Sequence, residues 1–171
     1  MKRLLLAAAV SLLTATSAMA QTVYLVRHAE KADASADPVL SEAGQARAAA
    51  LSAALAEAHP GYIFTSPLQR TRLTAEPTAT FHSAAIEPVG FDGGSAGHVA
   101  AIAERVRALP DDAVVLVVGH SNTIPLIARA LGFAEAADMP ECEYDRMTML
   151  HLAGDETHSQ VTRYGAPTTC P

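Results

Sequence analysis

Three apolar runs of the sequence are each followed by residues that could act on an anion. The groups are Arg27 with His28, Ser66 with Arg70, and Gly119 with His120, which follow residues 23–26, 62–65 and 113–118. Short apolar runs rich in β-branched residues predict buried strands. Ligands of open α/β sheets bind at the carboxyl ends of the strands. If the three strands are parallel, two imidazoles and two guanidiniums meet at one edge of the sheet.

These side chains have the properties that phosphoryl transfer requires. Arg27 and Arg70 stay charged at any working pH, and a guanidinium group binds two phosphate oxygens at once. Ser66, at the expected start of a helix, adds a hydroxyl group and nearby backbone N–H groups. One neutral imidazole could attack phosphorus while the other donates hydrogen bonds to its oxygens. No set of carboxylates accompanies them at the spacing of metal ligands, so we expect no metal in the site.

The elements that must position these residues alternate between strand and helix. We predict strands at 22–26, 62–65, 86–91, 113–118, 147–152 and 161–164, helices at 42–58, from 66 onward, at 98–109 and at 123–131, and a flexible loop at 92–97. Residues 113–118 are continuously apolar, which is typical of a central parallel strand that is covered on both faces. The alternation predicts one α/β domain.

Three segments resemble the motifs of a known family. Residues 27–30 read Arg-His-Ala-Glu and resemble the Arg-His-Gly-Glu signature of the histidine phosphatase superfamily, also called the phosphoglycerate mutase-like family. Residues 66–75 resemble its second motif and residues 119–122 its third. Ala29 stands where the family usually has glycine. The resemblance implies a phosphoglycerate mutase-like fold, a single-domain three-layer α/β/α sandwich with a mostly parallel central sheet.

The resemblance also implies a role for each residue of the site. His28 matches the nucleophile that becomes phosphohistidine, and Arg27, Arg70 and His120 match the rest of the phosphate pocket. The expected activity is that of a metal-independent phosphomonoesterase, in which water releases phosphate from His28. Its partner would be a small phosphorylated substrate, and no cofactor is implied.

Three further residues are candidates for substrate binding, namely Ser66, Lys31 and Asn122. Lys31 could attract phosphate, or it could form a solvent-exposed pair with Glu30. Asn122 could orient His120, or it could cap the helix that follows. The sequence leaves both pairs of alternatives open.

The acid that protonates the leaving oxygen is the least determined part of the site. The third motif continues with Ser121 and Asn122, so it lacks the acidic residue that one branch of the family has there. In the mutase-like branch the acid is a glutamate between the second and third motifs. The candidates in that segment are Glu87 and Asp92, and we choose Asp92 because the glycine-rich loop 92–97 could carry it over the pocket. The alternative is an ordinary loop aspartate, since aspartate is favoured in turns.

The first twenty residues have the pattern of a secretory signal peptide. Lys2 and Arg3 are basic, residues 4–13 are apolar apart from one serine, and residues 18–20 read Ala-Met-Ala. We expect cleavage after Ala20, which leaves residues 21–171 as the histidine phosphatase domain. The apolar run is too short to span a bilayer comfortably, so we expect no membrane span after cleavage. The predicted location is periplasmic or secreted.

Charge and cysteine content limit the partners. The chain has 12 Lys and Arg against 18 Asp and Glu, a formal net charge of −6, and loss of Lys2 and Arg3 with the signal peptide makes it −8. Such an acidic chain argues against nucleic acid as a partner, because nucleic-acid binding requires a basic face.

Cys142 and Cys170 are expected to form a disulfide in an oxidising compartment, the alternative being two unpaired thiols. The sequence does not indicate an oligomeric state.

Two other functions remain open. Residues 119–123 nearly match the Gly-x-Ser-x-Gly turn of α/β-hydrolases, although the final glycine is missing. A serine esterase would use Ser121 as its nucleophile, with Asp145 and either His151 or His158 in the right chain order. Alternatively, a non-catalytic phospho-ligand binding protein would keep the phosphate pocket without turnover.

Overall fold

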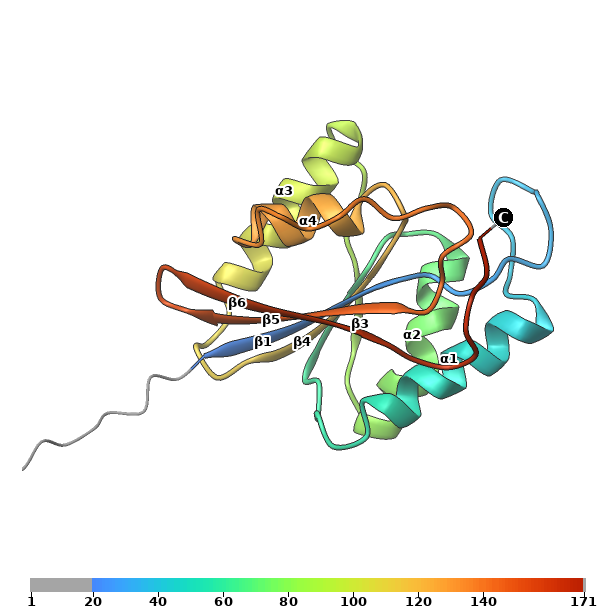
Figure 1. Ribbon diagram of the computed structural model, residues 1–171, viewed down its shortest axis with the longest axis horizontal. Helices are drawn as coiled ribbons and strands as arrows, with labels where there is room; N and C mark the ends of the chain where they lie inside the picture. Colours follow the sequence, from blue (N-terminus) through green and yellow to red (C-terminus); the bar gives the residue numbers. More distant parts are fainter. Residues whose placement is uncertain (1–19, 171) are drawn as a thin grey trace, which may run out of the picture.

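A six-stranded sheet forms the centre of the fold (Figure 1). The computed structural model describes residues 20–170. The strands are β1 (Gln21–Arg27), β2 (Tyr62–Thr65), β3 (Ile86–Pro88), β4 (Val114–Gly119), β5 (Arg146–Ala153) and β6 (Glu156–Arg163). Their order in the sheet is β3-β2-β4-β1-β5-β6. The first four strands of that order pair in parallel, whereas β5 and β6 are antiparallel additions.

Helices cover both faces of this sheet. They are α1 (Glu42–Ala54), α2 (Gln69–His82), α3 (Gly94–Arg107) and α4 (Ile124–Ala130). In Figure 1, α3 and α4 lie above the sheet, and α1 and α2 lie below it. The predicted three-layer α/β/α sandwich with a mostly parallel central sheet is therefore confirmed.

The sequence of β4 explains why the sheet is covered twice. Val115 and Val117 belong to the hydrophobic cluster between the sheet and helices α3 and α4. Leu116 and Val118 belong to the cluster between the sheet and helices α1 and α2. Side chains alternate between the two faces of a strand, so a continuous apolar run fills both cores.

The register of the parallel strands brings the three predicted motifs to one edge. β4 lies between β1 and β2, with Arg27 beside Gly119 and Thr65 beside Val118. The three strands therefore end at nearly the same level, and the residues that follow them share one edge of the sheet.

Helix α2 begins at Gln69, two residues later than predicted, because Ser66 is expected to be its N-cap. Its N-cap is Leu68, which makes no side-chain capping bond. Ser66 Oγ is instead hydrogen-bonded to His120 Nε2 and to Thr71 Oγ1. The sequence pattern assigns the Ser66 side chain to the cap of α2, but in the structure this side chain contacts His120 at the end of β4.

Helix α3 begins at Gly94, so the prediction of a flexible loop over 92–97 is wrong for residues 94–97. Gly93 has a φ of 75° and supplies the left-handed turn into the helix. The buried face of α3, which includes Val99, Ile102 and Val106, secures the helix against the sheet. Tertiary packing therefore outweighs the low helix propensity of the glycines.

The remaining boundaries differ by a few residues. Helix α1 ends at Ala54 instead of 58, and β3 ends at Pro88 instead of 91. Strand β6 begins at Glu156, five residues before the predicted start, because pairing with β5 holds a largely polar strand that lacks an apolar signal.

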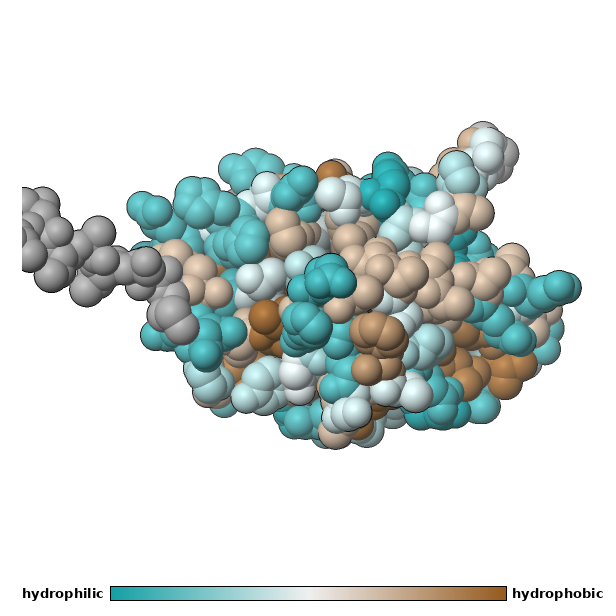
Figure 2. Space-filling model, turned by 90° about the horizontal axis from the view of Figure 1, so that it is seen from below, coloured by the Kyte–Doolittle hydropathy of each residue, from teal (hydrophilic) through white to brown (hydrophobic). Residues whose placement is uncertain are grey.

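The surface carries scattered apolar residues. Large exposed hydrophobic side chains in the described part are Val39, Tyr62, Phe81, Leu126 and Val161. Figure 2, which views the molecule from below Figure 1, shows brown patches separated by teal residues. Within residues 20–170, no helix has the length and apolar character needed to cross a membrane. The predicted signal peptide, apart from Ala20, lies outside the described residues.

Candidate active site

His28 follows β1 and presents one ring nitrogen as a lone-pair donor. Its backbone N–H bonds to Gly119 O, which ties the residue to β4. Its Nδ1 lies 2.8 Å from Ala29 O. A carbonyl oxygen can only accept, so Nδ1 carries the proton and Nε2 carries the lone pair. Burial, opposed by that hydrogen bond and assisted by the charges of Arg27 and Arg70, lowers the pKa of His28 to about 4. The ring is therefore neutral at pH 7, as a nucleophile must be.

His120 faces His28 from the end of β4. The two ring centroids are 5.2 Å apart in an edge-on arrangement. His120 Nε2 lies 3.0 Å from Ser66 Oγ, which leaves Nδ1 for a ligand. Burial, with the neighbouring His28 second, lowers the pKa of His120 to about 3. Ser66 itself is buried and supports the His120 ring, and its binding of substrate stays a prediction.

Two guanidinium groups, that of the buried Arg27 and that of the partly exposed Arg70, supply hydrogen-bond donors beside these rings. Within the described residues, Nε and Nη1 of Arg70 and Nε of Arg27 are buried and have no hydrogen-bond partner. The nearest carboxylate to Arg70 is that of Asp37, at a long 3.8 Å. Buried donors are normally paired. An anion with several oxygen atoms would satisfy these groups.

The four predicted catalytic residues with basic side chains line one pocket of about 290 Å³. Its lining consists of Arg27, His28, Lys31, Leu68, Arg70, Phe91, Ser95, His120, Ser121, Asn122, Thr123 and Glu141. The structure thus brings together His28, Arg27, Arg70 and His120, and it adds Lys31 and Asn122 at the rim.

Asp92, the predicted general acid, is not among the residues that line this pocket. Its side chain is exposed, and the pocket is lined instead by Phe91, which precedes it, and by Ser95 in the first turn of α3. The alternative, Glu87, forms an exposed ion pair with Arg105 on α3. The segment between the second and third motifs therefore supplies no carboxyl group to the lining.

Glu141, which sequence reasoning missed, is the carboxylic acid of the described lining. One of its carboxylate oxygens lies 2.7 Å from Arg27 Nη2. The other accepts a hydrogen bond from Ser121 Oγ. The Ser121 bond, followed by the charge of Arg27, outweighs burial and lowers the pKa of Glu141. No motif points to this residue, which lies between α4 and β5.

Residues 140–145, which we call the acid segment, pack against Arg27 and accept hydrogen bonds from its guanidinium group. Arg27 Nη1 donates to the carbonyl oxygens of Pro140 at 3.2 Å and Glu141 at 2.5 Å. The guanidinium carbon of Arg27 also lies 4.2 Å from the centre of the Tyr144 ring. Arg27 is thereby fixed by the same segment that carries Glu141.

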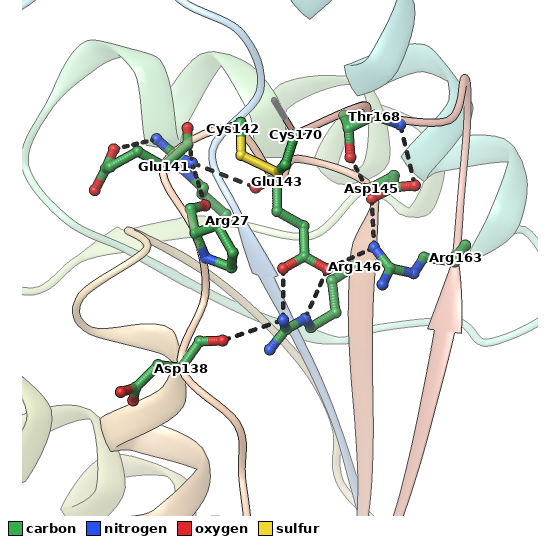
Figure 3. The surroundings of a disulfide bond; sticks show 11 residues. Arg27, Asp138, Glu141, Cys142, Glu143, Asp145, Arg146, Arg163, Thr168 and Cys170 are labelled. Carbon is green, nitrogen blue, oxygen red and sulfur yellow. Dashed lines mark hydrogen bonds and ion pairs between the residues drawn. A yellow bond between two sulfur atoms is a disulfide. The ribbon is translucent and has the colours of Figure 1, made fainter.

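A disulfide between Cys142 and Cys170 ties the acid segment to the C-terminal tail, as predicted (Figure 3). A second link runs from the hydroxyl group of Thr168 to Asp145, at 2.6 Å. Arg163 on β6 also donates to Asp145, at 2.7 Å. The tail, β6 and the acid segment therefore form one connected unit beside the pocket.

The first motif is anchored by its neighbours. Ala29 N donates to Thr74 Oγ1 at 2.9 Å, which explains the value of threonine in the second motif. Glu30 accepts from Arg47 on α1 at 2.7 Å, and Arg47 is buried. The alternative of an exposed pair between Glu30 and Lys31 is therefore wrong. Lys31 is exposed at the pocket rim.

Close approach of α1 to this motif makes Gly44 sensitive to substitution. A Cβ at Gly44 would lie 2.3 Å from Glu30 O. We expect Gly44→Ala to lower the free energy of unfolding by about 1–3 kcal/mol, because backbone must shift to relieve the clash. Urea denaturation measures this change. Gly61→Ala, where a Cβ meets nothing within 4 Å, is the matched control. Equal destabilisation in both variants contradicts the expectation.

The two pocket histidines should titrate below the ordinary histidine range. Their pKa values are lowered to about 4 for His28 and about 3 for His120. Both rings disfavour the charged form, so the stability that they contribute is present above about pH 6.5 and is lost as the pH falls towards those values. We expect ring NMR signals, assigned with His28→Ala and His120→Ala, to stay constant from about pH 8 to about pH 5.5. A transition centred above pH 6 for either ring contradicts this.

The geometry does not support a serine esterase. Ser121 Oγ donates to Glu141, not to an imidazole. His151 on β5 lies 3.1 Å from Thr22 Oγ1, and Asp145 is engaged by Arg163 and Thr168. The proposed triad is therefore not assembled in the described residues.

No group of three or more His, Cys, Asp or Glu side chains within residues 20–170 is arranged to hold a metal ion. Independence from metal stays a prediction that a chelator can test.

Comparisons with known proteins agree with this geometry. The model of the histidine phosphatase superfamily (branch 1) matches residues 23–90, which contain the first two motifs. No curated protein matches the chain.

Solved structures extend the likeness over the domain. A protein from Nakamurella multipartitia assigned as the phosphohistidine phosphatase SixA has 26% sequence identity and a TM-score of 0.60, and the match covers 86% of this chain and 96% of that one. A mycobacterial glucosyl-3-phosphoglycerate phosphatase has 18% identity and a TM-score of 0.62, covering 86% and 100%. Phosphoglycerate mutase from Bacillus anthracis has 15% identity and a TM-score of 0.65, covering 85% and 93%.

The last two structures, at their low identities, show the fold alone. The family match, the SixA likeness and the convergence of the motif residues in one pocket lead to one conclusion. Residues 23–90 match the histidine phosphatase superfamily, and the described chain has the fold of a protein assigned as one of its phosphatases.

Proposed function

We propose that this phosphatase is a metal-independent phosphomonoesterase that works through a phosphohistidine at His28. One observation carries the proposal. The Nε2 atom of His28 is available as a nucleophile, and the same pocket contains guanidinium groups with buried N–H donors that have no protein partner. A phosphoryl group placed among them would face a nucleophile and meet compensating positive charge.

In the first step, the lone pair of His28 Nε2 attacks phosphorus. A P–N bond forms while the bond between phosphorus and the leaving oxygen breaks. Arg27, Arg70 and His120 donate hydrogen bonds to the three remaining phosphoryl oxygens, where negative charge concentrates. In the second step, water attacks phosphorus and gives a proton to the carboxylate of Glu141, the acid of the first step. The P–N bond breaks, and neutral His28 and inorganic phosphate are released.

The leaving oxygen needs a proton as its bond breaks, and Glu141 is placed to give it. In the free site the pKa of Glu141 is lowered by Ser121 and Arg27. A bound phosphate dianion competes for Arg27 and adds negative charge next to the carboxylate, and both effects raise its pKa. Substrate binding therefore favours the protonated carboxyl group that the step requires.

Glu141→Gln should slow poor leaving groups more than good ones. A phenolate needs a proton more than a para-nitrophenolate does, because it is the stronger base. We expect the variant to lower kcat about 100-fold for phenyl phosphate and less than about tenfold for para-nitrophenyl phosphate. Steady-state kinetics on both esters measures the two losses. If Asp92→Asn produces this pattern and Glu141→Gln does not, the sequence-based choice of Asp92 is restored.

The activity itself is tested with para-nitrophenyl phosphate and the mature chain, with and without a chelator. Turnover that resists the chelator supports the proposal. Turnover that the chelator abolishes and added metal restores contradicts metal independence. Binding of inorganic phosphate without turnover of any phosphomonoester would favour the alternative of a non-catalytic binding protein.

The location is part of the same proposal. An oxidising compartment, the periplasm or the exterior, suits the disulfide between Cys142 and Cys170. N-terminal sequencing of the protein recovered from that fraction should begin at Gln21. A protein that keeps Met1 and stays with the cytoplasm contradicts this part.

A further inference from the structure

A second depression adjoins the phosphate pocket. It has a volume of about 300 Å³, and its lining includes Ser121, Asn122 and Glu141. The same three residues line the phosphate pocket. The two hollows therefore share a wall, and a ligand with its phosphate in one can extend its remainder into the other.

The far wall of this depression is largely apolar. Pro125 and Leu126 come from the first turn of α4, and Met139 comes from the loop that follows α4. The side chain of Leu126 is 40% exposed, although most leucines of the described chain are buried. A ligand that covers this apolar wall would gain from removing it from water.

The charges of the two hollows differ. Arg27, Lys31 and Arg70 line the phosphate pocket. The described lining of the depression contains no cationic side chain, and it contains two carboxylates, Glu141 and Asp138. Each of these carboxylates already has an ion-pair partner, Glu141 with Arg27 and Asp138 with Arg129, both at 2.7 Å. The described lining therefore offers no additional cation to pair with a negative charge on this part of a ligand.

We propose that this depression, the leaving-group subsite, receives the alcohol part of the phosphomonoester. It selects leaving groups that have an apolar surface and no negative charge, such as phenols or apolar alcohols. The proposal rests on the proposed phosphatase function. It sets this chain apart from enzymes whose leaving group carries a carboxylate, because the lining of the subsite offers no cation to pair with such a group.

Binding of two non-hydrolysable phosphonates tests the subsite without requiring turnover. Benzylphosphonate and 4-carboxybenzylphosphonate differ by one carboxylate at the far end of the ring. We expect calorimetry on the mature chain to give at least about tenfold tighter binding of benzylphosphonate. Dissociation constants within twofold of one another overturn the proposal.

A charge-introducing variant locates the effect. Leu126→Lys places a cation in the subsite, and we expect it to reduce the preference for benzylphosphonate at least about fivefold. Val161→Lys is the matched control, because Val161 is also exposed but lies on β6 and lines neither hollow. Calorimetry with inorganic phosphate, which has no leaving group, reports whether the phosphate pocket is intact in each variant. An equal change of preference in both variants overturns the assignment.

Failure of the subsite and failure of the phosphatase function give different results. Selective phosphonate binding without turnover of phenyl phosphate supports the subsite and contradicts the function. Turnover of phenyl phosphate with equal binding of the two phosphonates supports the function and contradicts the subsite.

Discussion

Replacing His28 by alanine is expected to lower kcat for para-nitrophenyl phosphate by at least about 10³-fold. The variant removes the protein atom that is proposed to form a bond to phosphorus. Arg27, Arg70 and His120 remain in the pocket, so we expect inorganic phosphate still to bind. Steady-state kinetics and phosphate calorimetry on the same sample separate loss of chemistry from loss of the pocket.

His158→Ala is the control for this variant. His158 lies on β6, and its side chain is 74% exposed. This substitution should leave kcat within about twofold of the parent value, as surface changes usually do. A His28→Ala protein that keeps more than about a tenth of the parent kcat contradicts nucleophilic catalysis by His28.

Removal of the disulfide is expected to have the second large effect. Cys142 and Cys170 are separated by 28 residues. For a closed loop of that length, the chain-entropy model gives a loss of about 3–4 kcal/mol in the free energy of unfolding. The double variant Cys142→Ser/Cys170→Ser, followed by urea denaturation, measures that loss without leaving a reactive thiol.

The same variant should also lower kcat/KM, by about tenfold or more. The disulfide holds the acid segment, which positions both Arg27 and Glu141. Thr168→Val is the comparison, because it removes a bond from the tail to Asp145 and keeps the disulfide. If the double variant matches the parent in kcat/KM under conditions where both are folded, the disulfide has no part in positioning the site.

Much of the site could be predicted because its residues sit where apolar runs end. Arg27 is the last residue of β1 and His120 follows β4, two strands whose hydrophobic character marks them as buried. The parallel register then places Arg27 beside Gly119. Once the strands are predicted and taken as parallel, the residues at their ends are therefore expected in one pocket. The local pattern and the tertiary arrangement agree at these positions.

Predictions failed where a distant contact decides the structure. Ser66 has the sequence signal of a helix cap, but its hydroxyl group is used by His120, 54 residues away. Glu141 has no local signal, because its place depends on carbonyl bonds to Arg27 and on the disulfide. Asp92 lies in a segment of the expected kind, but the described lining contains its neighbours Phe91 and Ser95 and not Asp92, so its role as the acid stays an untested prediction.

The most direct test of the account is to trap the intermediate. The mature protein is mixed with a phosphomonoester and quenched in alkali before one turnover is complete, since phosphohistidine is stable in base and labile in acid. Peptide mass spectrometry should find one phosphoryl group on the peptide that contains His28, and none after acid treatment. Full turnover with no phosphoryl group on His28 at any quench time would contradict a phosphohistidine mechanism.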